Sequence, residues 1–351
     1  MRCYKFTQAG VAHALRGEGN DDACLLVRCG DTALAFMADG MGSAGFGGEA
    51  ARLCVDAGSR AACATFAPHE LLSDKSGAVA AKAAFLSAFN GLQKEAALTN
   101  RPLAEFQTTF MAAAYDARTG VLRFGYCGDG GLFVCLRDGS FAVAVQPQKG
   151  ENVNVTSGVL DCDAWSFGRI DNVAGFMMAT DGLFEGMSET IGGGSVVATS
   201  EACRAFAAAI AGEQGGRPGG ADGLFASTAA QATPFSSVSD DRTVCVAASD
   251  EASRLTLCAA SLRFDCEMPF SQSCRADEEE SWSEYVPLPF CHANVESGKE
   301  PKGAFLPFCM TAKKPKRKSV KQASGKSRSC GVLEGNAGTH VAGGGRTPLW
   351  S

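Results

Sequence analysis

Up to Ser249, hydrophobic and polar positions follow one another in short runs that turn residues separate. Apolar runs of four to eight residues between such breaks are typical of β-strands. Asp and Gly residues at 30–31, 116–120 and 138–139 suit tight turns between antiparallel neighbours. We therefore expect sequential hairpins in an antiparallel sheet system. The pattern predicts strands at 23–29, 32–38, 108–115, 122–127, 132–136, 141–145, 175–179 and 243–248.

Two alanine-rich stretches, 48–66 and 77–98, interrupt the strands and predict helices. In the second stretch, Phe85, Phe89 and Leu92 recur at helical spacing, which places them on one face that can pack against a sheet. A third helix is expected at 200–211, followed by a glycine-rich loop at 212–223. Strands, then paired helices, then strands again indicate a layered α+β domain rather than a doubly wound one.

The character of the chain changes near residue 250, where the apolar periodicity fades. The segment after Ser249 holds seven of the twelve prolines, an acidic run at 277–280 and a basic run at 313–318. This composition is typical of disorder, because it offers little apolar surface to offset the entropy of ordering. We expect a folded domain at 1–249 and a mostly disordered tail at 250–351. The basic run is interpreted as a solvated segment, with an acidic binding partner as the alternative.

Composition excludes several other classes of protein. The 351 residues, 46% of them hydrophobic, are enough for a sizeable core, and a net charge of −6 does not favour nucleic acid as a partner. No signal-peptide pattern opens the chain and no apolar stretch could span a membrane, so we expect a cytoplasmic protein. The 16 cysteines show no metal-binding spacing. We expect them to be reduced and buried, and to pack as small apolar residues.

The candidate functional residues are aspartates at the ends of apolar runs, and several of them are followed by glycine. Carboxylates placed there can gather in one cleft, because the glycines let the backbone turn and approach closely. Without a cation they would repel one another and their pKa values would rise. An all-oxygen ligand set favours Mg²⁺ or Mn²⁺ over zinc. A single Asp-Gly pair usually marks only a turn, so it is the whole series that indicates a metal site.

Five motifs follow one another along the chain: Asn20-Asp21-Asp22, Asp39-Gly40-Met41-Gly42, Gly128-Asp129-Gly130-Gly131, Ala179-Thr180-Asp181-Gly182-Leu183 and Asp240-Asp241-Arg242-Thr243. In this order they resemble the motif set of PP2C-type metal-dependent protein serine/threonine phosphatases, bacterial branch. The resemblance covers about residues 1–248. It implies a four-layer αββα sandwich, in which helices flank two antiparallel β-sheets and a two-metal centre lies at one end. The implied reaction is hydrolysis of phosphoserine or phosphothreonine by direct attack of a metal-bridging water.

The resemblance assigns metal ligands position by position. Asp39 looks like the carboxylate that bridges two Mg²⁺ or Mn²⁺ ions, and the carbonyl of Gly40 looks like a ligand of one of them. Asp181 and Asp240 resemble the other carboxylates of the first metal. Asp129 resembles an aspartate that helps to hold a third, weaker metal ion.

The opening motif contributes the remaining site residues. Asp22 matches an invariant aspartate of the family, and Asp21 takes the place of a usual Glu or Gln as a candidate ligand of shorter reach. Arg16 resembles the phosphate-binding arginine, with an ordinary surface arginine as the alternative. The resemblance therefore implies Asp39, Asp22 and Arg16 as catalytic residues.

The chain also departs from the family pattern at two later motifs. Met41 stands where some members carry a histidine proposed as general acid, and Gly130-Gly131 replaces a frequent Ser-Arg pair. His13, near the first motif, is more often structural than catalytic in such a position. The segment 183–234 falls where these enzymes vary most, as a flap beside the cleft or as a plain surface loop.

The resemblance implies a phosphatase that acts on phosphorylated proteins and opposes a cognate Ser/Thr kinase. A regulatory phosphatase with an anti-anti-sigma-like substrate is one alternative, because Asp240-Asp241-x-Thr also occurs there. A catalytically inactive pseudophosphatase that binds a kinase or adaptor is the other. Four mutually repelling carboxylates argue against a mere binding module, which would not need them.

Overall fold

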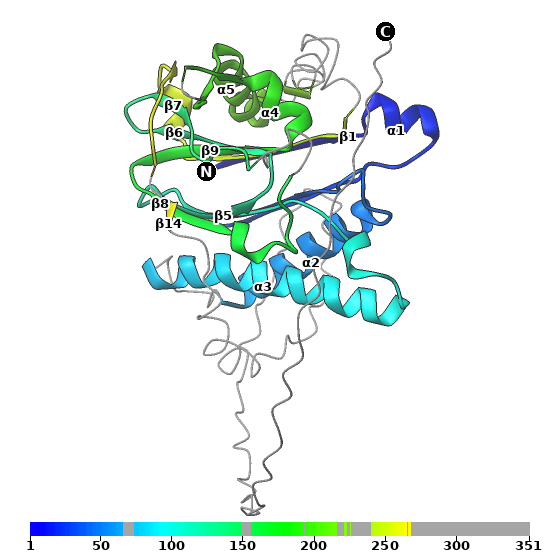
Figure 1. Cartoon of the computed structure of the whole chain (residues 1–351). Coiled ribbons are helices and arrows are strands. Elements are labelled where there is room, and N and C mark those ends of the chain that lie inside the picture. Colours follow the sequence, from blue (N-terminus) through cyan, green and yellow to red (C-terminus); the bar gives the residue numbers. More distant parts are fainter. Residues whose placement is uncertain are drawn as a thin grey trace, which may run out of the picture. The chain divides into compact units, whose positions relative to one another are not determined.

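Two main β-sheets lie face to face in the computed structural model of the chain, with helices on both outer sides (Figure 1). The structure describes residues 1–65, 74–148, 156–192, 194–215, 221–222, 225, 240–264 and 266–267. These residues belong to one unit, Met1–Phe290.

The first sheet has the strand order β1-β12-β9-β6-β7-β13 in the described residues. Neighbouring strands are antiparallel except for β13, which runs parallel to β7. The strands are β1 (Arg2–Gln8), β6 (Gly131–Leu136), β7 (Ser140–Val143), β9 (Val173–Ala179), β12 (Arg242–Ala248) and β13 (Cys258–Ala259).

The second sheet has the order β14-β8-β5-β4-β3-β2, and all of its neighbours are antiparallel. The turns between β2 and β3 and between β4 and β5 are the ones that the Asp and Gly residues predict. The strands are β2 (Asp22–Cys29), β3 (Thr32–Asp39), β4 (Phe110–Asp116), β5 (Val121–Cys127), β8 (Ser166–Ile170) and β14 (Cys266–Glu267).

Helices complete four layers. The pair α2 (Gly47–Thr65) and α3 (Asp74–Thr99) covers the second sheet, and α4 (Asp181–Met187) and α5 (Ser200–Gly215) cover the first (Figure 1). The α+β sandwich with αββα layers is therefore confirmed. The remaining elements are α1 (Val11–Arg16), η1 (Leu103–Glu105), η2 (Cys162–Ala164), β10 (Ser188–Thr190), β11 (Val196–Ala198) and η3 (Ala252–Arg254).

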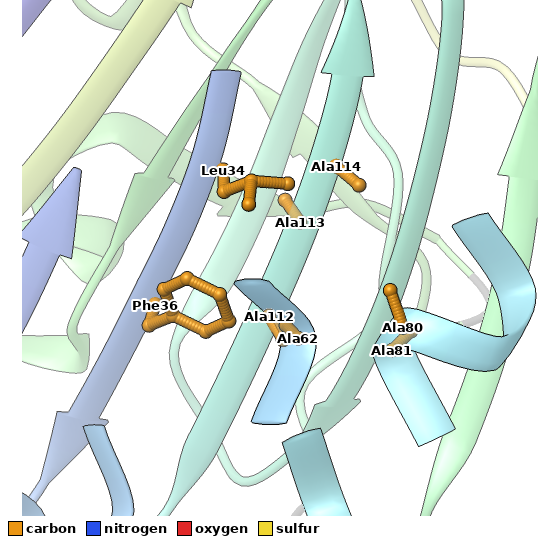
Figure 2. Close-up of a pocket in the computed structure, with 8 residues that line it drawn as sticks. All are labelled: Leu34, Phe36, Ala62, Ala80, Ala81, Ala112, Ala113 and Ala114. Carbon is orange, nitrogen blue, oxygen red and sulfur yellow. The ribbon is translucent and has the colours of Figure 1, made fainter. Parts of the chain in front are cut away.

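Side-chain alternation along β3 shows why the layers form. Leu34, Phe36 and Ala38 face the helices, whereas Ala33, Ala35 and Met37 face the other sheet, because successive strand residues point to opposite sides. Both sides are covered, so the run 33–38 is apolar throughout. Small side chains let the helices pack closely and leave a slight apolar hollow at the second sheet (Figure 2). Its lining is Leu34, Phe36, Ala62, Ala80, Ala81, Ala112, Ala113 and Ala114.

The eight strands and three helices expected from periodicity are confirmed, with ends that differ by at most four residues. The elements that the pattern missed are short or poorly buried. For example, β1 is an edge strand without a fully buried residue, and α1 has no buried residue. Such elements depend on tertiary neighbours and carry little apolar periodicity of their own. The missed elements are β1, β8, β10, β11, β13, β14, α1 and α4.

Described elements continue beyond the expected boundary at Ser249. Ala252 is buried, β13 pairs with β7, and β14 pairs with β8. The amino group of Met1 donates a hydrogen bond to Asp250 Oδ2 at 3.2 Å. These two-residue strands are too short to give a periodic pattern. The acidic and basic runs of the tail lie outside the described residues.

The segment 183–234 is not a plain surface loop where it is described. Leu183 and Phe184 of α4 and Phe206 of α5 are buried against the first sheet, and β10 and β11 form a hairpin. Residues 212–215 continue α5 and do not begin the glycine-rich loop. Most of the rest of that loop, and its place beside the cleft, lie outside the described residues.

The cysteines agree only partly with their expected burial. The described chain contains six buried cysteines, whereas Cys29 and Cys258 are exposed. Cys29 ends the edge strand β2, and Cys258 lies on the edge strand β13 of the first sheet. Among the described residues, each of these strands has a neighbouring strand on one edge only. The buried ones are Cys54, Cys127, Cys135, Cys162, Cys203 and Cys245.

Candidate functional site

The candidate aspartates meet at one end of the sandwich because antiparallel pairing brings their strand ends together. Asp22 begins β2 and lies directly opposite Asp39, the last residue of β3. Asp181 follows β9 as the first residue of α4. Asp240 precedes β12, which pairs with β9, and Asp129 lies in the turn between β5 and β6.

Asp22 is buried and is held by a threonine from the first sheet. Thr180 donates a hydrogen bond from Oγ1 to Asp22 Oδ2 at 2.9 Å and accepts one from the backbone N–H of Thr243 at 3.0 Å. The second carboxylate oxygen, Oδ1, has no hydrogen-bond donor among the described residues. Asp22 is therefore fixed through one oxygen, and the other one can accept a further ligand.

Asp39 and Asp181 lie close enough for their carboxyl groups to affect each other's pKa. Thr109 lies beside Asp39 and accepts its backbone N–H through Oγ1 at 3.0 Å. Asp181 Oδ1 is buried without a hydrogen-bond donor in the described part of the chain. Asp181, like Asp22, therefore has an oxygen that can accept a further ligand.

Burial and mutual repulsion raise the pKa of all four central carboxyl groups. For Asp22 and Asp39 the pKa lies well above its ordinary value, mainly through desolvation and then through neighbouring carboxylates. The pKa of Asp181 rises to about 7 for the same two causes, and that of Asp240 rises mainly through burial. The predicted rise is confirmed, although burial, rather than repulsion, is the larger cause.

The donor set fits hard divalent cations. Two buried carboxylate oxygens lack a donor, and the central groups offer only oxygen atoms, which Mg²⁺ and Mn²⁺ prefer. Within the described ranges, no three acidic, His or Cys side chains already surround a single point as ready ligands. A change in the conformation of these side chains would therefore accompany cation binding.

Asp21 and Gly40 lie beside the first turn of α2. The backbone N–H of Gly40 donates to the Asp21 carbonyl at 3.3 Å. A methyl group on Gly40 would overlap the backbone of Gly47 and Gly48, so only glycine allows this close approach. The Asp21 carboxyl group lies against Gly48 at the helix N-terminus, where a negative charge is favourable.

Asp129 lies close enough to raise the pKa values of Asp181 and Asp240 by charge repulsion. Its Oδ2 accepts a hydrogen bond from Thr156 Oγ1 at 2.6 Å. The departure at Gly130-Gly131 has a packing reason, because a side chain on Gly131 would overlap the Phe184 ring.

The structure does not bring Arg16 together with these carboxylates. Its side chain is exposed on α1, and Nε lies 2.6 Å from Glu18 Oε2. His13, also on α1, is paired through Nδ1 with Asp241 Oδ2 at 2.9 Å, which favours its structural interpretation. The phosphate-binding role of Arg16 stays a prediction.

Sequence reasoning missed the importance of Asp241 and Thr180. In the motifs, both residues stand only as neighbours of the candidate ligands Asp240 and Asp181. Asp241 is 2% exposed and accepts hydrogen bonds from three groups of the segment 10–21. The signal in the sequence was a second aspartate directly after a candidate ligand. Its hydrogen-bond partners could not be identified there, because they lie more than 200 positions away.

Comparison with protein families gives one match, to protein phosphatase 2C, over residues 9–214. The chain belongs to the protein phosphatase 2C family. This family is a class of serine/threonine protein phosphatases, so the chain is assigned to that class of enzyme. The matched residues include the first four motifs and end before Asp240.

Solved structures share the fold of this PP2C-family chain at low sequence identity. A variant of a bacterial serine phosphatase is 15% identical with a TM-score of 0.50, over 71% of this chain and 97% of that one. The catalytic domain of the serine/threonine protein phosphatase PstP, in complex with two manganese ions, is 17% identical with a TM-score of 0.50. That match covers 70% of this chain and 97% of that one.

Comparison with curated protein sequences gives no match. Among the described residues of this PP2C-family chain, none of the helices has the length and apolarity that crossing a membrane requires.

Proposed function

We propose that this chain is an active, metal-dependent phosphatase that hydrolyses phosphoserine and phosphothreonine in proteins. One observation carries the proposal: Asp22, Asp39, Asp181 and Asp240 meet at one end of the sandwich, with two buried carboxylate oxygens that have no donor. Such a cluster is costly to the fold, because buried like charges destabilise it unless a cation neutralises them. The binding of catalytic cations accounts for its presence.

The residues that would hold two Mg²⁺ or Mn²⁺ ions are Asp39, the Gly40 carbonyl, Asp181, Asp240 and the opening pair of aspartates. PstP, a structure of the same fold, contains two manganese ions, which supports a divalent metal requirement. When bound, such ions lower the pKa of water and orient a phosphate for in-line attack. Asp129 would hold a third, weaker ion through the oxygen that Thr156 leaves available.

The chain's own residues would prepare the site in two ways. Thr180 keeps Asp22 in place through Oδ2 and leaves Oδ1, which has no donor among the described residues, available to a ligand. Arg16 would bind the phosphoryl oxygens after leaving Glu18, since a guanidinium group pairs with phosphate in a bidentate manner. We further propose that phosphorylated proteins and a cognate Ser/Thr kinase are the partners.

The test is hydrolysis of p-nitrophenyl phosphate and of a phosphothreonine peptide with Mn²⁺, Mg²⁺ or EDTA. The wild type should turn over both substrates only with a divalent cation. Asp39→Asn should lower kcat at least about a hundredfold, because it removes the carboxylate shared by both ions. Asp116→Asn is the control, since Asp116 is a buried aspartate that pairs with the start of β3, whereas Asp39 ends that strand.

Absence of turnover from a wild-type protein shown to be folded would contradict the proposal. It would favour the catalytically inactive pseudophosphatase. One observation supports that alternative, since Arg16 is paired with Glu18 and lies apart from the carboxylate cluster. Retained turnover in Asp39→Asn would instead contradict the role of Asp39.

A further inference from the structure

Asp241 is a buried carboxylate for which the metal site has no assigned use. It accepts the backbone N–H of Gly10 at Oδ1 at 2.6 Å, and the backbone N–H of Asp21 at Oδ2 at 2.6 Å. The Nδ1 of His13 lies 2.9 Å from the same Oδ2. All three donors come from one segment, residues 10–21, which lies between β1 and β2.

Only a carboxylate can accept all three hydrogen bonds. An asparagine has a single acceptor oxygen, and its NH₂ group would face at least one of the three donors. The two backbone N–H groups approach different oxygens, so no side-chain flip of an asparagine satisfies both of them. Removing one acceptor would leave a buried donor without a partner, which is unfavourable.

The segment 10–21 has little other support from packing. Its helix α1 has six residues and none of them is buried, and it ends at Gly17 in the left-handed conformation. Val11 is 44% exposed and Leu15 is 83% exposed. Near its end, Asn20 Nδ2 donates to Thr7 Oγ1 at 2.7 Å. The carbonyl of Asp21 also accepts the N–H of Gly40 at 3.3 Å, so the end of the segment has several contacts. Asp241 is the buried side chain that bonds to the start of the segment as well as to its end.

The segment matters because it leads directly into Asp21 and Asp22 and carries Arg16. An isolated helix of this length is unstable in water, so its position must be imposed from outside. Groups that hold ligands by hydrogen bonds commonly change metal affinity 10- to 100-fold when they are replaced.

We propose that Asp241 is a positioning residue that fixes the segment 10–21 and so orients Asp21, Asp22 and Arg16 for metal and phosphate binding. The proposal rests on the proposed function for its catalytic consequence, but not for its structural one. Asp240, its neighbour, would ligate the metal, whereas Asp241 acts through the backbone and through His13.

The test compares Asp241→Asn with the wild type and with Asp116→Asn as control. Asp116 is also a buried aspartate that accepts two hydrogen bonds, from the N–H of Arg118 and the hydroxyl of Thr119, both at 2.9 Å. Hydrogen exchange of the full chain, measured in EDTA, reports on the segment without any metal. Peptides covering 10–21 should exchange at least about tenfold faster in Asp241→Asn and unchanged in Asp116→Asn.

Calorimetric titration with Mn²⁺ is the second measurement. The Kd for Mn²⁺ should rise about 10- to 100-fold in Asp241→Asn, while Asp116→Asn keeps the wild-type value. At saturating Mn²⁺, the KM of Asp241→Asn for p-nitrophenyl phosphate should still exceed that of the wild type, because Arg16 is no longer held in place for phosphate binding. A merely structural role would lower stability in both variants and leave the Kd for Mn²⁺ alone.

Equal exchange of 10–21 in the wild type and in Asp241→Asn would overturn the proposal. Faster exchange with an unchanged Kd for Mn²⁺ would overturn its second half, the orientation of the ligands. If Asp241→Asn does not fold, His13→Ala removes only the partly exposed donor, and exchange of α1 should still accelerate. Absence of turnover in a wild type with normal exchange and Mn²⁺ binding would contradict the proposed function and leave the positioning role standing.

Discussion

At the residue scale, the site depends on carboxyl groups that are individually ordinary. Asp39 and Asp181 affect each other's pKa, and Asp22 is held by Thr180. Because burial disfavours the charged form, the pKa of Asp181 rises to about 7, far above that of an exposed aspartate. Stability and cation binding are consequently linked to pH through the same side chains.

Stability without divalent cations should fall as the pH rises from about 4 to about 7. In this range the folded chain holds more protons on Asp181 than the unfolded chain does. Folding therefore takes up protons and becomes less favourable as the pH rises. A shift of about three pKa units corresponds to a loss of up to about 4 kcal/mol in the free energy of unfolding. Thermal unfolding in EDTA between pH 4.5 and 7.5 measures the effect.

Two comparisons test this pH dependence. Asp39→Asn should flatten the profile and raise Tm in EDTA near pH 7, since one buried charge is removed. Saturating Mn²⁺ should also flatten the profile of the wild type. A wild-type Tm that increases from pH 5 to 7 in EDTA would show that these carboxyl groups are not protonated in the folded chain.

At the scale of elements, helix α3 is joined to the second sheet by aromatic packing. Phe85 is fully buried, and its ring centroid lies 4.9 Å from that of Phe110 and 5.4 Å from that of Trp165. β4, which carries Phe110, leads back to Thr109 and so to the backbone of Asp39. The helix layer thus supports the strand end that places the central carboxylate.

Phe85→Ala should lower the free energy of unfolding by about 3–5 kcal/mol, because it leaves a cavity among packed rings. Urea denaturation measures this change. Leu98→Ala, on the same helix at a site 71% exposed, is the control and should change stability by less than about 0.5 kcal/mol. Equal stability of the two variants would contradict the packing of α3 described above.

At the scale of the whole molecule, the start of the chain contacts the segment that follows β12. Arg2 and the amino group of Met1 both contact Asp250, and Phe264 packs against the core between the sheets. Residues beyond Ser249 therefore take part in the fold. A domain boundary after Glu267 respects these contacts, whereas one after Ser249 cuts through them.

A chain truncated after Glu267 should keep the wild-type Tm in EDTA, because every described contact is retained. Truncation after Ser249 should lower the free energy of unfolding by about 2 kcal/mol or more, since it exposes the apolar surface that Ala252 and Phe264 cover. Urea denaturation of both truncated chains and the full chain measures it. Equal stability of the two truncated chains would show that residues 250–267 add nothing to the fold.

The sequence by itself determined the main strands, the three long helices and the set of candidate aspartates. These features are local, because an apolar run or an Asp-Gly pair is visible within a few neighbouring positions. The ordered motifs also indicated the family and hence the four layers. The short strands β13 and β14 could not be found in this way, since they exist only through pairing with β7 and β8.

Only the tertiary structure decided how deeply each aspartate is buried and which groups it contacts. Burial, which depends on the packing of both sheets, proved the larger cause of the raised pKa values at Asp22 and Asp39. The pairing of Asp241 with His13 and with two backbone groups joins positions more than 200 residues apart. Such contacts leave no periodic trace in the chain, because hydrogen-bond partners are chosen by proximity in the folded state and not by spacing along the sequence.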